Sequence, residues 1–589
     1  MLAIFAVSLS AQETIDCETS LEIWQVQSAG EQAHCLRERV FLEDNIVTAT
    51  GSSGFFMQTP SERTDDDPLT SDGVYVFTDI PAIGFGIQVG DRVSVEGRVA
   101  EFYNLTQIEV RGRRNIEILS SGNAVPEPID LMTVDLTWVA GVDVHPLERY
   151  EGMFVTIQDG LVVAPTNYFD EFGVSLTGQR VFREEGIEID NTPEFAGMGL
   201  PQFDLNPELI EIDPPEMGLD VEFVTVGSRA TVTGGLAYSY ADYQIWPRDL
   251  SVTIADYAPR PVRAPEAGEF TVATQNMYNL FDLFDDPRRA DSPFEEYVPA
   301  NTDLYQVRLR KMSDQIRTNL NSPDILAIQE LENARVLTDL AFQIHADDPS
   351  LKYATCFQEG NDSRGIDNAF LIRTDHVNLL SCQRLPGSLD ATAPVGGGLL
   401  FGRPPLVLEV DLLLGNGQSF PITLINLHIK SLSGADTEAV QAKRMAQAVI
   451  VADYVQSLLD QDPDAHVIVL GDLNAFEVSD GLVDVVGIIS GNHDPQAAWM
   501  APEQDTLEPD LINQVLRLPQ EERYSYVYNS TAQVLDHILT TPALDVFVTD
   551  AQFSRGNADA LYGWEFEDNG ALRSSDHDGF VIYIQPIPE

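Results

Sequence analysis

Hydrophobic and polar residues alternate along several stretches of the N-terminal half of the chain. Between residues 89 and 110, Val93, Val95 and Val99 are separated by polar or small residues. A period of two is typical of β-strands that bury one face. Gly90 and Gly97 mark turns or bends in this stretch. The pattern therefore predicts an all-β N-terminal region.

Two of these stretches are related to each other. Residues 89–110 and 226–247 share, without a gap, the pattern V-G-x-R-x-x-V-x-G, followed by Ala, Tyr and Gln-Ile in register. The repeat predicts a tandem duplication of a small all-β unit, with copies spanning 38–125 and 148–253. Residues 256–268, DYAPRPVRAPEAG, are rich in Pro, Ala and Gly, a composition typical of a linker, which is placed at 254–267.

The pattern changes after the linker. Apolar residues recur at helical spacing in 305–320 and again in 438–460. Each of these stretches is followed by a short apolar run, ILAI at 325–328 and VIVL at 467–470. Helices that alternate with buried strands predict layered α/β packing for the C-terminal part. The expected fold class is therefore α+β, with tandem all-β units before an α/β domain at 268–586.

Length and charge refine this picture. A chain of 589 residues is expected to form two to four domains. It has 34 Lys+Arg against 93 Asp+Glu, a formal net charge of −59. Such a chain stays soluble by self-repulsion and repels polyanions at long range. Adaptation to saline surroundings explains this charge, and recruitment of a cationic partner is the alternative.

The N-terminus and the cysteines bear on localisation. An apolar stretch from Leu2 to Leu9 precedes small residues and resembles the back half of a secretory signal that lacks its basic start. A buried strand or a wrongly chosen start codon are the alternatives. The four cysteines form two local pairs, Cys17/Cys35 and Cys356/Cys382, which predicts disulfides in an oxidising compartment. We expect a secreted protein, extracellular or periplasmic, that does not span a membrane.

Six strand ends in the C-terminal half carry polar residues. They lie in TVATQNMYNLFD, DILAIQELEN, ITLINLHIKS, VIVLGDLNAF, VLDHILTT and SSDHDGFVI. One such strand end is ordinary capping, but six in one domain are harder to explain in that way. Carboxylates with amides suit a hard cation such as Mg²⁺. Histidine and aspartate beside such a cation suit acid–base chemistry on a phosphate.

These segments resemble the endonuclease/exonuclease/phosphatase superfamily, whose fold is that of deoxyribonuclease I. The resemblance covers residues 268–586 and implies a four-layered α/β/β/α sandwich that hydrolyses phosphodiesters. It also implies Mg²⁺ as cofactor, with Mn²⁺ as a substitute and Ca²⁺ as a further candidate.

The resemblance assigns roles to single residues. Asn276, Glu330 and Asp576 would serve the metal, with Glu330 as the main ligand. His428 would hydrogen-bond a phosphate oxygen. Asp472 and Asn474 would orient the attacking water and bind the phosphate, and two residues apart on an extended strand end they would point to the same side. Asp536 would pair with His577, fix its tautomer and raise its pKa, and His577 would act on the scissile phosphate.

Three further residues are candidates for substrate binding. DSRGIDNAFLIR resembles an element of the secreted nuclease branch, in which Arg364 would hold a phosphate and Asp367 would buttress His428; a salt bridge within a loop is the alternative. Lys430 would contact the nucleic-acid backbone, unless it is simply solvated. His537 receives no role. Glu332 departs from the vertebrate pattern, which has a basic residue there.

The first all-β unit also has a resemblance. GFFMQTP, the acidic run Asp65–Asp67 and TSDGVYVF resemble the OB-fold domain that precedes the nuclease domain of secreted bacterial nucleases. The tandem units are therefore expected to be OB-like. The acidic run is expected to be a solvated loop, with a Ca²⁺ site as the alternative.

The predicted function is hydrolysis of extracellular DNA that leaves 5′-phosphates, by a monomer with no protein partner. A second reading keeps the site but changes the substrate to RNA, nucleotides or small phosphoesters. A third is a nucleic-acid-binding adhesin with an inactive hydrolase domain. The complete set Glu330, Asp472, Asp536 and His577 argues against the third reading. The absence of an obvious basic, aromatic-rich face in either β unit also weakens a pure binding role.

Overall fold

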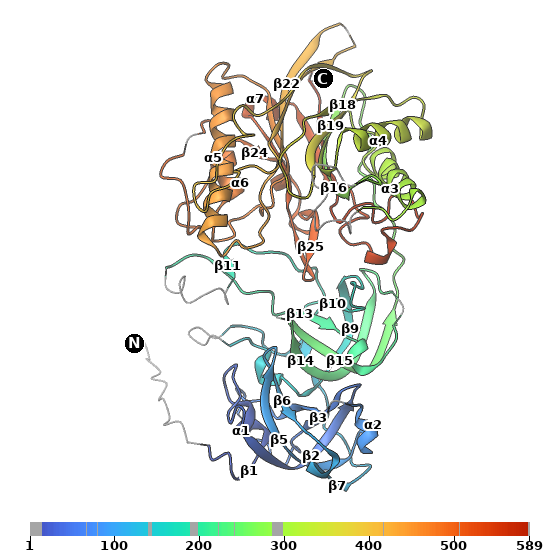
Figure 1. Cartoon of the computed structure of the whole chain (residues 1–589), viewed down its shortest axis with the longest axis vertical. Helices are drawn as coiled ribbons and strands as arrows, with labels where there is room; N and C mark the ends of the chain where they lie inside the picture. Colours follow the sequence, from blue (N-terminus) through green and yellow to red (C-terminus); the bar gives the residue numbers. More distant parts are fainter. Residues whose placement is uncertain are drawn as a thin grey trace. The chain divides into compact units, whose positions relative to one another are not determined.

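A computed structural model shows two compact units (Figure 1). The structure describes residues 15–65, 67–78, 80–138, 144–188, 198–221, 223–240, 242–284, 298–415, 417–505 and 507–586. Unit 1 comprises residues 1–179 and 207–255, and unit 2 comprises residues 180–206 and 256–589. The signal-like stretch from Leu2 to Leu9 and Asp66 of the acidic run lie outside the described residues.

Unit 1 contains two barrel-like sheets. In the first, the strands follow the order β2-β3-β4-β6-β5, and β5 pairs back with β2. The alternating valines of β5 point into a core that α1 and α2 help to close. The elements are β1 (Ser20–Leu21), α1 (Ile23–Gln27), β2 (Arg39–Thr50), β3 (Gly54–Gln58), β4 (Gly73–Phe77), α2 (Ala82–Phe85), β5 (Arg92–Phe102), β6 (Leu105–Glu109) and β7 (Ile116–Ser120).

The second sheet repeats this arrangement. Its strands follow the order β9-β10-β13-β15-β14, and β10 and β14 both pair with β9. In the first barrel β4 is parallel to β6, and in the second β13 is parallel to β15. The pairs β5–β6 and β14–β15 are antiparallel. The strands are β8 (Ile129–Asp130), β9 (Phe154–Ala164), β10 (Phe172–Ser175), β13 (Leu209–Ile212), β14 (Arg229–Ser239) and β15 (Asp242–Thr253). The shared strand order supports the duplication seen in the sequence.

One part of the second predicted repeat belongs to unit 2. Residues 180–206 lie between β10 and β13 in the sequence but belong to unit 2. They contain the short parallel pair β11 (Ile187–Glu188) and β12 (Gln202–Phe203). The predicted linker is also bound to unit 2, since Arg260 pairs with Arg555 and Val262 is buried in its core. Contacts along 254–267 thus hold this segment in place, unlike a free linker.

Unit 2 has two six-stranded sheets. The first follows the order β18-β19-β17-β16-β29-β28 and the second β20-β21-β22-β23-β27-β24. Strands of the first sheet are β16 (Phe270–Leu280), β17 (Ile325–Leu331), β18 (Tyr353–Phe357), β19 (Asp367–Arg373), β28 (Val548–Phe553) and β29 (Phe580–Ile584). Strands of the second are β20 (Val377–Arg384), β21 (Leu406–Leu413), β22 (Ser419–His428), β23 (Val467–Asp472), β24 (Ile512–Asn513) and β27 (Asp536–Thr540). A separate hairpin consists of β25 (Tyr526–Tyr528) and β26 (Thr531–Gln533).

The helices cover the outer faces of these sheets. Helices α3 (Thr302–Asp314) and α4 (Ala334–Asp347) pack on the first sheet, and α5 (Glu438–Leu459) and α6 (Val485–Ser490) pack on the second. Short α7 (Pro542–Asp545) follows β27. A third apolar core lies between the sheets, which gives four layers, α/β/β/α. The helices and strands predicted from apolar spacing are confirmed, because α3 with its π-helical turn to Asn319 covers most of 305–320 and α5 covers 438–459.

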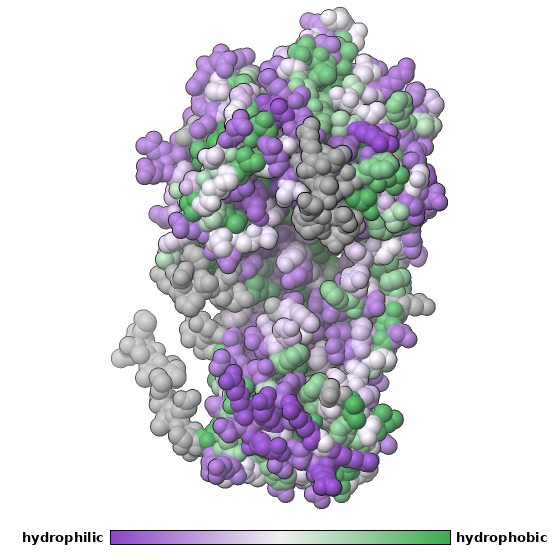
Figure 2. Space-filling view, in the orientation of Figure 1, coloured by the Kyte–Doolittle hydropathy of each residue, from purple (hydrophilic) through white to green (hydrophobic). Residues whose placement is uncertain are grey.

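Both predicted disulfides are present, Cys17–Cys35 in unit 1 and Cys356–Cys382 in unit 2. They hint at an oxidising environment. Among the described residues, no helix is both long and apolar enough to cross a membrane. The face seen in Figure 2 is largely hydrophilic, with scattered apolar patches.

Candidate active site

The predicted site residues come together where the two sheets of unit 2 end on the same side. On the second sheet, His428 of β22 pairs in register with Asp472 of β23, and Asp472 with Asp536 of β27. On the first sheet, Asn276 of β16 lies opposite Gln329 of β17, next to Glu330. Five residues from distant parts of the chain thus occupy neighbouring strand ends.

An aspartate–histidine pair forms one side of the site. His577 Nδ1 lies 2.7 Å from Asp536 Oδ2, and both side chains are buried. Burial alone would lower the pKa of His577, but the charge and hydrogen bond of Asp536 raise it well above the usual value. The ring also packs on Tyr526, with centroids 4.8 Å apart. The structure therefore holds a buried, positively charged imidazole.

The loop before β29 turns His577 into this position. The Ser575 hydroxyl accepts a hydrogen bond from the His577 backbone amide at 3.1 Å and donates one to the Asn276 carbonyl at 2.7 Å. The amides of Gln275 and Asn557 both donate to the His577 carbonyl at 2.9 Å. The backbone bends at Asp576 and His577, and β29 begins only at Phe580.

Asp472 links the two sheets. Its Oδ2 accepts a hydrogen bond from Asn276 Nδ2 at 3.1 Å and lies 3.4 Å from His428 Nε2. Burial, assisted by the nearby charges of Asp536 and Glu330, raises the pKa of Asp472 to about 7, although His577 opposes this. Burial and the cationic Arg403 and Arg364 hold the pKa of His428 well below its usual value. The pair therefore consists of a proton-accepting carboxylate and a neutral imidazole.

Glu330 lies at the end of β17 in an unusual backbone conformation. Its φ of 60° falls in the left-handed region, which is costly for a side chain other than glycine. The Asn279 backbone amide donates to Glu330 Oε2 at 3.0 Å. Oε1 lies 3.8 Å from both Arg364 Nη2 and His428 Nε2. The backbone strain thus directs a carboxylate towards the other site residues.

The expectation for Asn474 was wrong in its geometry. Strand β23 ends at Asp472, and Asn474 has a φ of 45°, so the two residues do not continue an extended strand. Instead, the backbone amide of Asn474 donates a hydrogen bond to Asp472 Oδ1 at 2.9 Å. The side-chain Nδ2 of Asn474 donates to the Ile429 carbonyl at 3.2 Å. A tight turn, which period-two reasoning does not describe, brings the two residues together.

The residues predicted for a metal supply suitable donors. Asn276 Oδ1 accepts from the Tyr278 amide at 2.9 Å and keeps further acceptor capacity. Asp576 is partly exposed, with Oδ1 3.5 Å from Ser575 Oγ. Two carboxylates and an amide match the oxygen preference of a hard divalent cation. Within the described ranges no group of three or more His, Cys, Asp or Glu is arranged to hold a metal, and this mixed set with an amide is not such a group.

The three candidates for substrate binding have different surroundings. Arg364 donates to Asn279 Oδ1 at 3.2 Å, close to Glu330. Asp367 begins β19 and is buried, and its predicted contact with His428 stays a prediction. Lys430 Nζ donates to Ser431 and Ser433 of its own loop. Burial lowers the pKa of Lys430 to about 8, with smaller effects from its cationic neighbours Arg444, Arg403, Lys443 and Arg364.

Several residues of the site were not singled out from the sequence. Arg403 is buried, donates to the Ile429 carbonyl at 3.2 Å, and lies 3.5 Å from Asp362. Asp578 is buried and accepts from Arg555 and from the amide of Asn557. The sequence gives little indication that these two residues belong to the site. Arg403 lies in a short segment with glycine and proline, FGRPP, and Asp578 is only one of three acidic or histidine residues in a row in SSDHDG.

Residues 180–206 support one wall of this site. Val181 and Arg183 form backbone hydrogen bonds with Ala532 of β26, and Asn206 donates to Thr531 at 3.1 Å. The partner strand β25 carries Tyr526, which packs on His577. The guanidinium of Arg183 also lies 4.0 Å and 4.8 Å from the ring centroids of Phe203 and Phe476. This segment therefore touches both the Tyr526 hairpin and the loop after Asn474.

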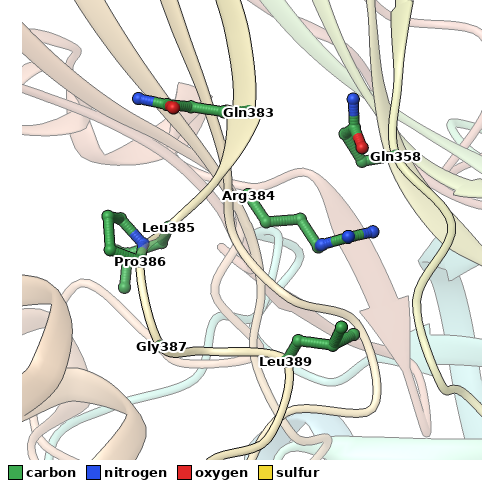
Figure 3. A pocket seen from close by; sticks show the side chains of 7 residues that line it. All are labelled: Gln358, Gln383, Arg384, Leu385, Pro386, Gly387 and Leu389. Carbon is green, nitrogen blue, oxygen red and sulfur yellow. The ribbon is translucent and has the colours of Figure 1, made fainter.

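A hollow of about 330 Å³ lies elsewhere on unit 2 and contains none of the predicted site residues. Arg384 donates to the Glu359 carbonyl at 2.7 Å, so the hollow borders the loop that leads to Arg364. Figure 3 shows its lining, which is Gln358, Gln383, Arg384, Leu385, Pro386, Gly387 and Leu389. The hollow is therefore distinct from the polar cluster at the strand ends.

Comparisons with known proteins support the assignment of unit 2. Residues 271–554 match the Endonuclease/Exonuclease/phosphatase family. The C-terminal part of the chain is thus supported as a hydrolase domain of that family. Family members act on phosphodiesters or phosphate esters and generally use divalent metals. Residues 141–256 match a domain of unknown function.

The solved structures that are similar to the chain have low sequence identity. Truncated Caenorhabditis elegans TDP2 is 16% identical with a TM-score of 0.33, covering 54% of this chain and 97% of that chain. A Bacteroides thetaiotaomicron family protein is 16% identical with a TM-score of 0.34, covering 56% and 98%. The human Nocturnin catalytic domain is 14% identical with a TM-score of 0.33, covering 54% and 95%. No curated protein matches the chain.

Proposed function

We propose that this protein is a secreted, metal-dependent nuclease that hydrolyses extracellular DNA and leaves 5′-phosphates. The observation that carries the proposal is the 2.7 Å pair between Asp536 and His577, set beside Asp472 and Glu330 in a family hydrolase domain. A buried charged imidazole next to Asp472, whose pKa burial raises to about 7, is costly for stability and suits chemistry on a phosphate.

His577 is inferred to stabilise the negative charge that develops on the scissile phosphate. Asp536 keeps the imidazole protonated and fixes the tautomer through Nδ1, which leaves Nε2 to donate to a phosphate oxygen. No rearrangement is needed for this, because the backbone of His577 is already held by Ser575 and Gln275.

Asp472 is inferred to act as the general base. A carboxylate with a pKa of about 7 can accept a proton from water near neutral pH. Its Oδ1 is held by the Asn474 backbone amide, so the turn after β23 orients it. The neutral His428, 3.4 Å away, can donate to a second phosphate oxygen from Nε2. Water then attacks in line, and the 3′ oxygen leaves.

Glu330, Asn276 and Asp576 would hold the divalent cation, Mg²⁺ with Mn²⁺ as a substitute, and Ca²⁺ is a further candidate. When bound, such an ion neutralises charge on the phosphate and activates water. The strained conformation of Glu330 is consistent with this role, because strain of this kind is retained at functional sites.

A local group of cationic residues supports an anionic polymer as substrate. Arg364, Arg403, Lys443 and Arg444 all lie close enough to Lys430 to lower its pKa, in a chain of net charge −59. Two further features support the setting. The strand order and closure of both barrels fit the OB type, which commonly binds nucleic acid. The two disulfides fit a secreted monomer.

The proposal is tested with a gel assay on duplex DNA, single-stranded DNA and RNA, with and without chelator. We expect cleavage of DNA, loss of activity in chelator, and recovery with Mg²⁺ or Mn²⁺. Calorimetric titration of Mg²⁺ without substrate should show weaker binding to Glu330→Gln. Full turnover in excess chelator contradicts the metal role. Activity confined to RNA or to small phosphoesters contradicts DNA as the substrate.

A further inference from the structure

Three arginines project from one turn of the first barrel. Arg111, Arg113 and Arg114 lie in the segment VRGRRN between β6 and β7, and all three are exposed. In the described part of the chain, none of their side chains has a hydrogen bond or an ion pair. They fall within four residues of a chain that has 93 acidic and 34 basic residues. We call this segment, residues 111–114, the arginine turn.

Nearly all the other arginines that the structure describes have a hydrogen-bond or ion-pair partner. Among the described residues, every arginine outside this turn except Arg37 donates a hydrogen bond or forms an ion pair. On the same barrel, exposed Arg39 and Arg98 pair with Glu96 and Glu109, each at 3.0 Å. With so many acidic partners at hand, three adjacent unpaired guanidinium groups stand out.

The backbone of the turn keeps the three side chains on the surface. Gly112 has a φ of 100°, a conformation that favours glycine, and it separates Arg111 from the short 3₁₀ turn at Arg113–Asn115. The Asn115 side chain donates to the Arg111 carbonyl at 3.2 Å. A Cβ built on Gly86 would lie 3.2 Å from Arg113 Nη2, so this guanidinium lies beside the end of α2.

We infer that the arginine turn is an accessory binding site for the phosphate backbone of nucleic acid. Guanidinium groups bind phosphate with paired, charge-assisted hydrogen bonds, and they remain charged at any working pH. The inference rests on the proposed function for the identity of the polymer, since a nuclease of net charge −59 must overcome repulsion of its substrate. The turn supplies local attraction on a unit separate from the hydrolase domain.

Nucleic acid fits the turn better than an acidic protein segment. The chain has 93 acidic residues, and none of those that the structure describes is paired with these arginines, whereas nearby Arg39 and Arg98 are paired. Phosphates along a nucleic-acid strand repeat regularly and suit a row of cations. An anionic lipid surface offers phosphates as well, and the experiment separates the two.

The test measures binding directly. Full-length protein with His577→Ala, which is expected to consume the probe roughly 10²–10³-fold more slowly, is titrated against a fluorescently labelled DNA oligonucleotide at several salt concentrations. The variant with Arg111→Gln, Arg113→Gln and Arg114→Gln should bind about 10-fold more weakly at about 50 mM salt. The slope of log Kd against log salt should differ from that of the parent by about two to three, because three phosphate contacts are lost.

The control removes the same charge elsewhere on unit 1. Arg39→Gln, Arg98→Gln and Arg229→Gln together replace exposed arginines that already have acceptors, and they should leave affinity within about 3-fold of the parent. Equal losses in both triple variants would overturn the inference, and so would no loss, or no measurable binding by the parent. Loss of binding to phosphatidylserine vesicles without loss of oligonucleotide binding would assign the turn to lipid and also overturn it.

The test is independent of the proposed catalysis. With His577 intact, the arginine-turn variant should hydrolyse a small chromogenic phosphodiester at the unaltered rate while its KM for polymeric DNA rises. If the protein cleaves no DNA but the turn binds it, the proposed function fails and the accessory site stands. If the protein cleaves DNA with an unchanged KM in this variant, the accessory site fails and the proposed function stands.

Discussion

The Asp536–His577 pair concentrates the electrostatics of the site in one interaction. Both side chains are buried, and Asp536 Oδ1 has no hydrogen-bond partner among the described residues. Burying a charged pair this deeply seldom stabilises a protein, because desolvation offsets much of the attraction. The pair is therefore better explained by its effect on a phosphate than by its effect on the fold.

Replacing either member should affect turnover more than binding. His577→Ala should lower kcat roughly 10²–10³-fold and leave the affinity for DNA nearly intact. Asp536→Asn should also lower kcat and shift the pH profile, because a neutral amide no longer raises the pKa of His577. The double variant should be far less impaired than the product of the two, as expected for residues that act as one unit.

Turnover and melting temperature measured on the same His577→Ala sample decide between catalysis and capping. A near-normal rate with a lowered melting temperature would refute the catalytic role. The rate should be measured well below the melting temperature of each variant, so that loss of folded protein does not imitate loss of catalysis.

At the residue scale, chemistry was easier to predict than conformation. The proximity of Glu330, Asp472, Asp536 and His577 could be predicted because carboxylates and imidazoles lie at the ends of several apolar strands, and their roles stay predictions. The left-handed backbone conformation at Glu330 and Asn474 could not be predicted, because a positive φ at a residue other than glycine arises from the surrounding packing. Arg403 was missed for a similar reason, since its burial beside His428 depends on tertiary contacts.

At the element scale, the contribution of residues 180–206 was not foreseen. This segment lies inside the second repeat in sequence, and only contacts across the fold join it to unit 2. The period-two and period-3.6 patterns, in contrast, correctly predicted strands in unit 1 and helices in unit 2, because each pattern reports which face of an element is buried. Sequence periodicity carries no information on which unit a long excursion packs against.

Arg183 allows this support to be tested. It is buried between Phe203 and Phe476 and donates to the Gly186 carbonyl at 2.7 Å. Arg183→Ala should free Phe476 and loosen the turn that follows Asn474. We expect a fall in kcat of about 10-fold to 100-fold with an unchanged KM, since small misplacements of catalytic groups are costly.

Steady-state kinetics on Arg183→Ala and Arg183→Lys check this expectation. Lysine keeps the charge but cannot stack a planar group on the two rings, so it should not rescue kcat. Arg229→Ala, an exposed arginine of β14, is the matched control. An unaltered kcat in folded Arg183→Ala would mean that the segment only stabilises unit 2.

Unit 1 contains a group of carboxylates with no cationic partner among the described residues. Glu151 is fully buried, with Oε1 accepting from the Thr106 amide at 3.1 Å and Oε2 without a partner. Glu148 accepts from the Tyr243 hydroxyl at 2.5 Å, and Glu101 accepts from Ala33 at 2.8 Å. Burial, and then their mutual repulsion, raises the pKa of Glu151 well above the usual value and that of Glu148 to about 7.

These shifts make the stability of unit 1 depend on pH. The pKa values of these groups are higher in the folded protein than in the unfolded chain. Their contribution to the free energy of unfolding is therefore fully present below about pH 4.5 and is lost as the pH rises through about 7. Glu151→Gln should raise the melting temperature of unit 1 by roughly 5 °C at pH 8 and change it little at pH 4.5. Calorimetry at both pH values measures this, and an equal change at both would show that titration of Glu151 is not involved.

At the scale of the whole molecule, charge acts in two opposite ways on a nucleic acid. The net charge of −59 repels the polymer over a distance that salt shortens. The cationic group around Lys430 and the arginine turn attract it locally, and salt weakens such contacts by competition. The local attraction does not follow from composition, because net charge does not reveal where the few unpaired arginines lie.

The balance of the two terms can be read from the salt dependence of activity on polymeric DNA at fixed Mg²⁺. In the wild-type protein we expect kcat/KM to hold or rise as salt increases towards roughly marine strength, since screening of the repulsion offsets the lost contacts. In the variant with Arg111→Gln, Arg113→Gln and Arg114→Gln fewer local contacts remain for salt to weaken, so kcat/KM should rise more steeply with salt. A small phosphodiester carries little charge, so neither the repulsion nor the local attraction acts on it strongly. Its kcat/KM should depend very little on salt. A steep and continuous fall for the wild-type protein would show that local basic contacts dominate over the acidic surface.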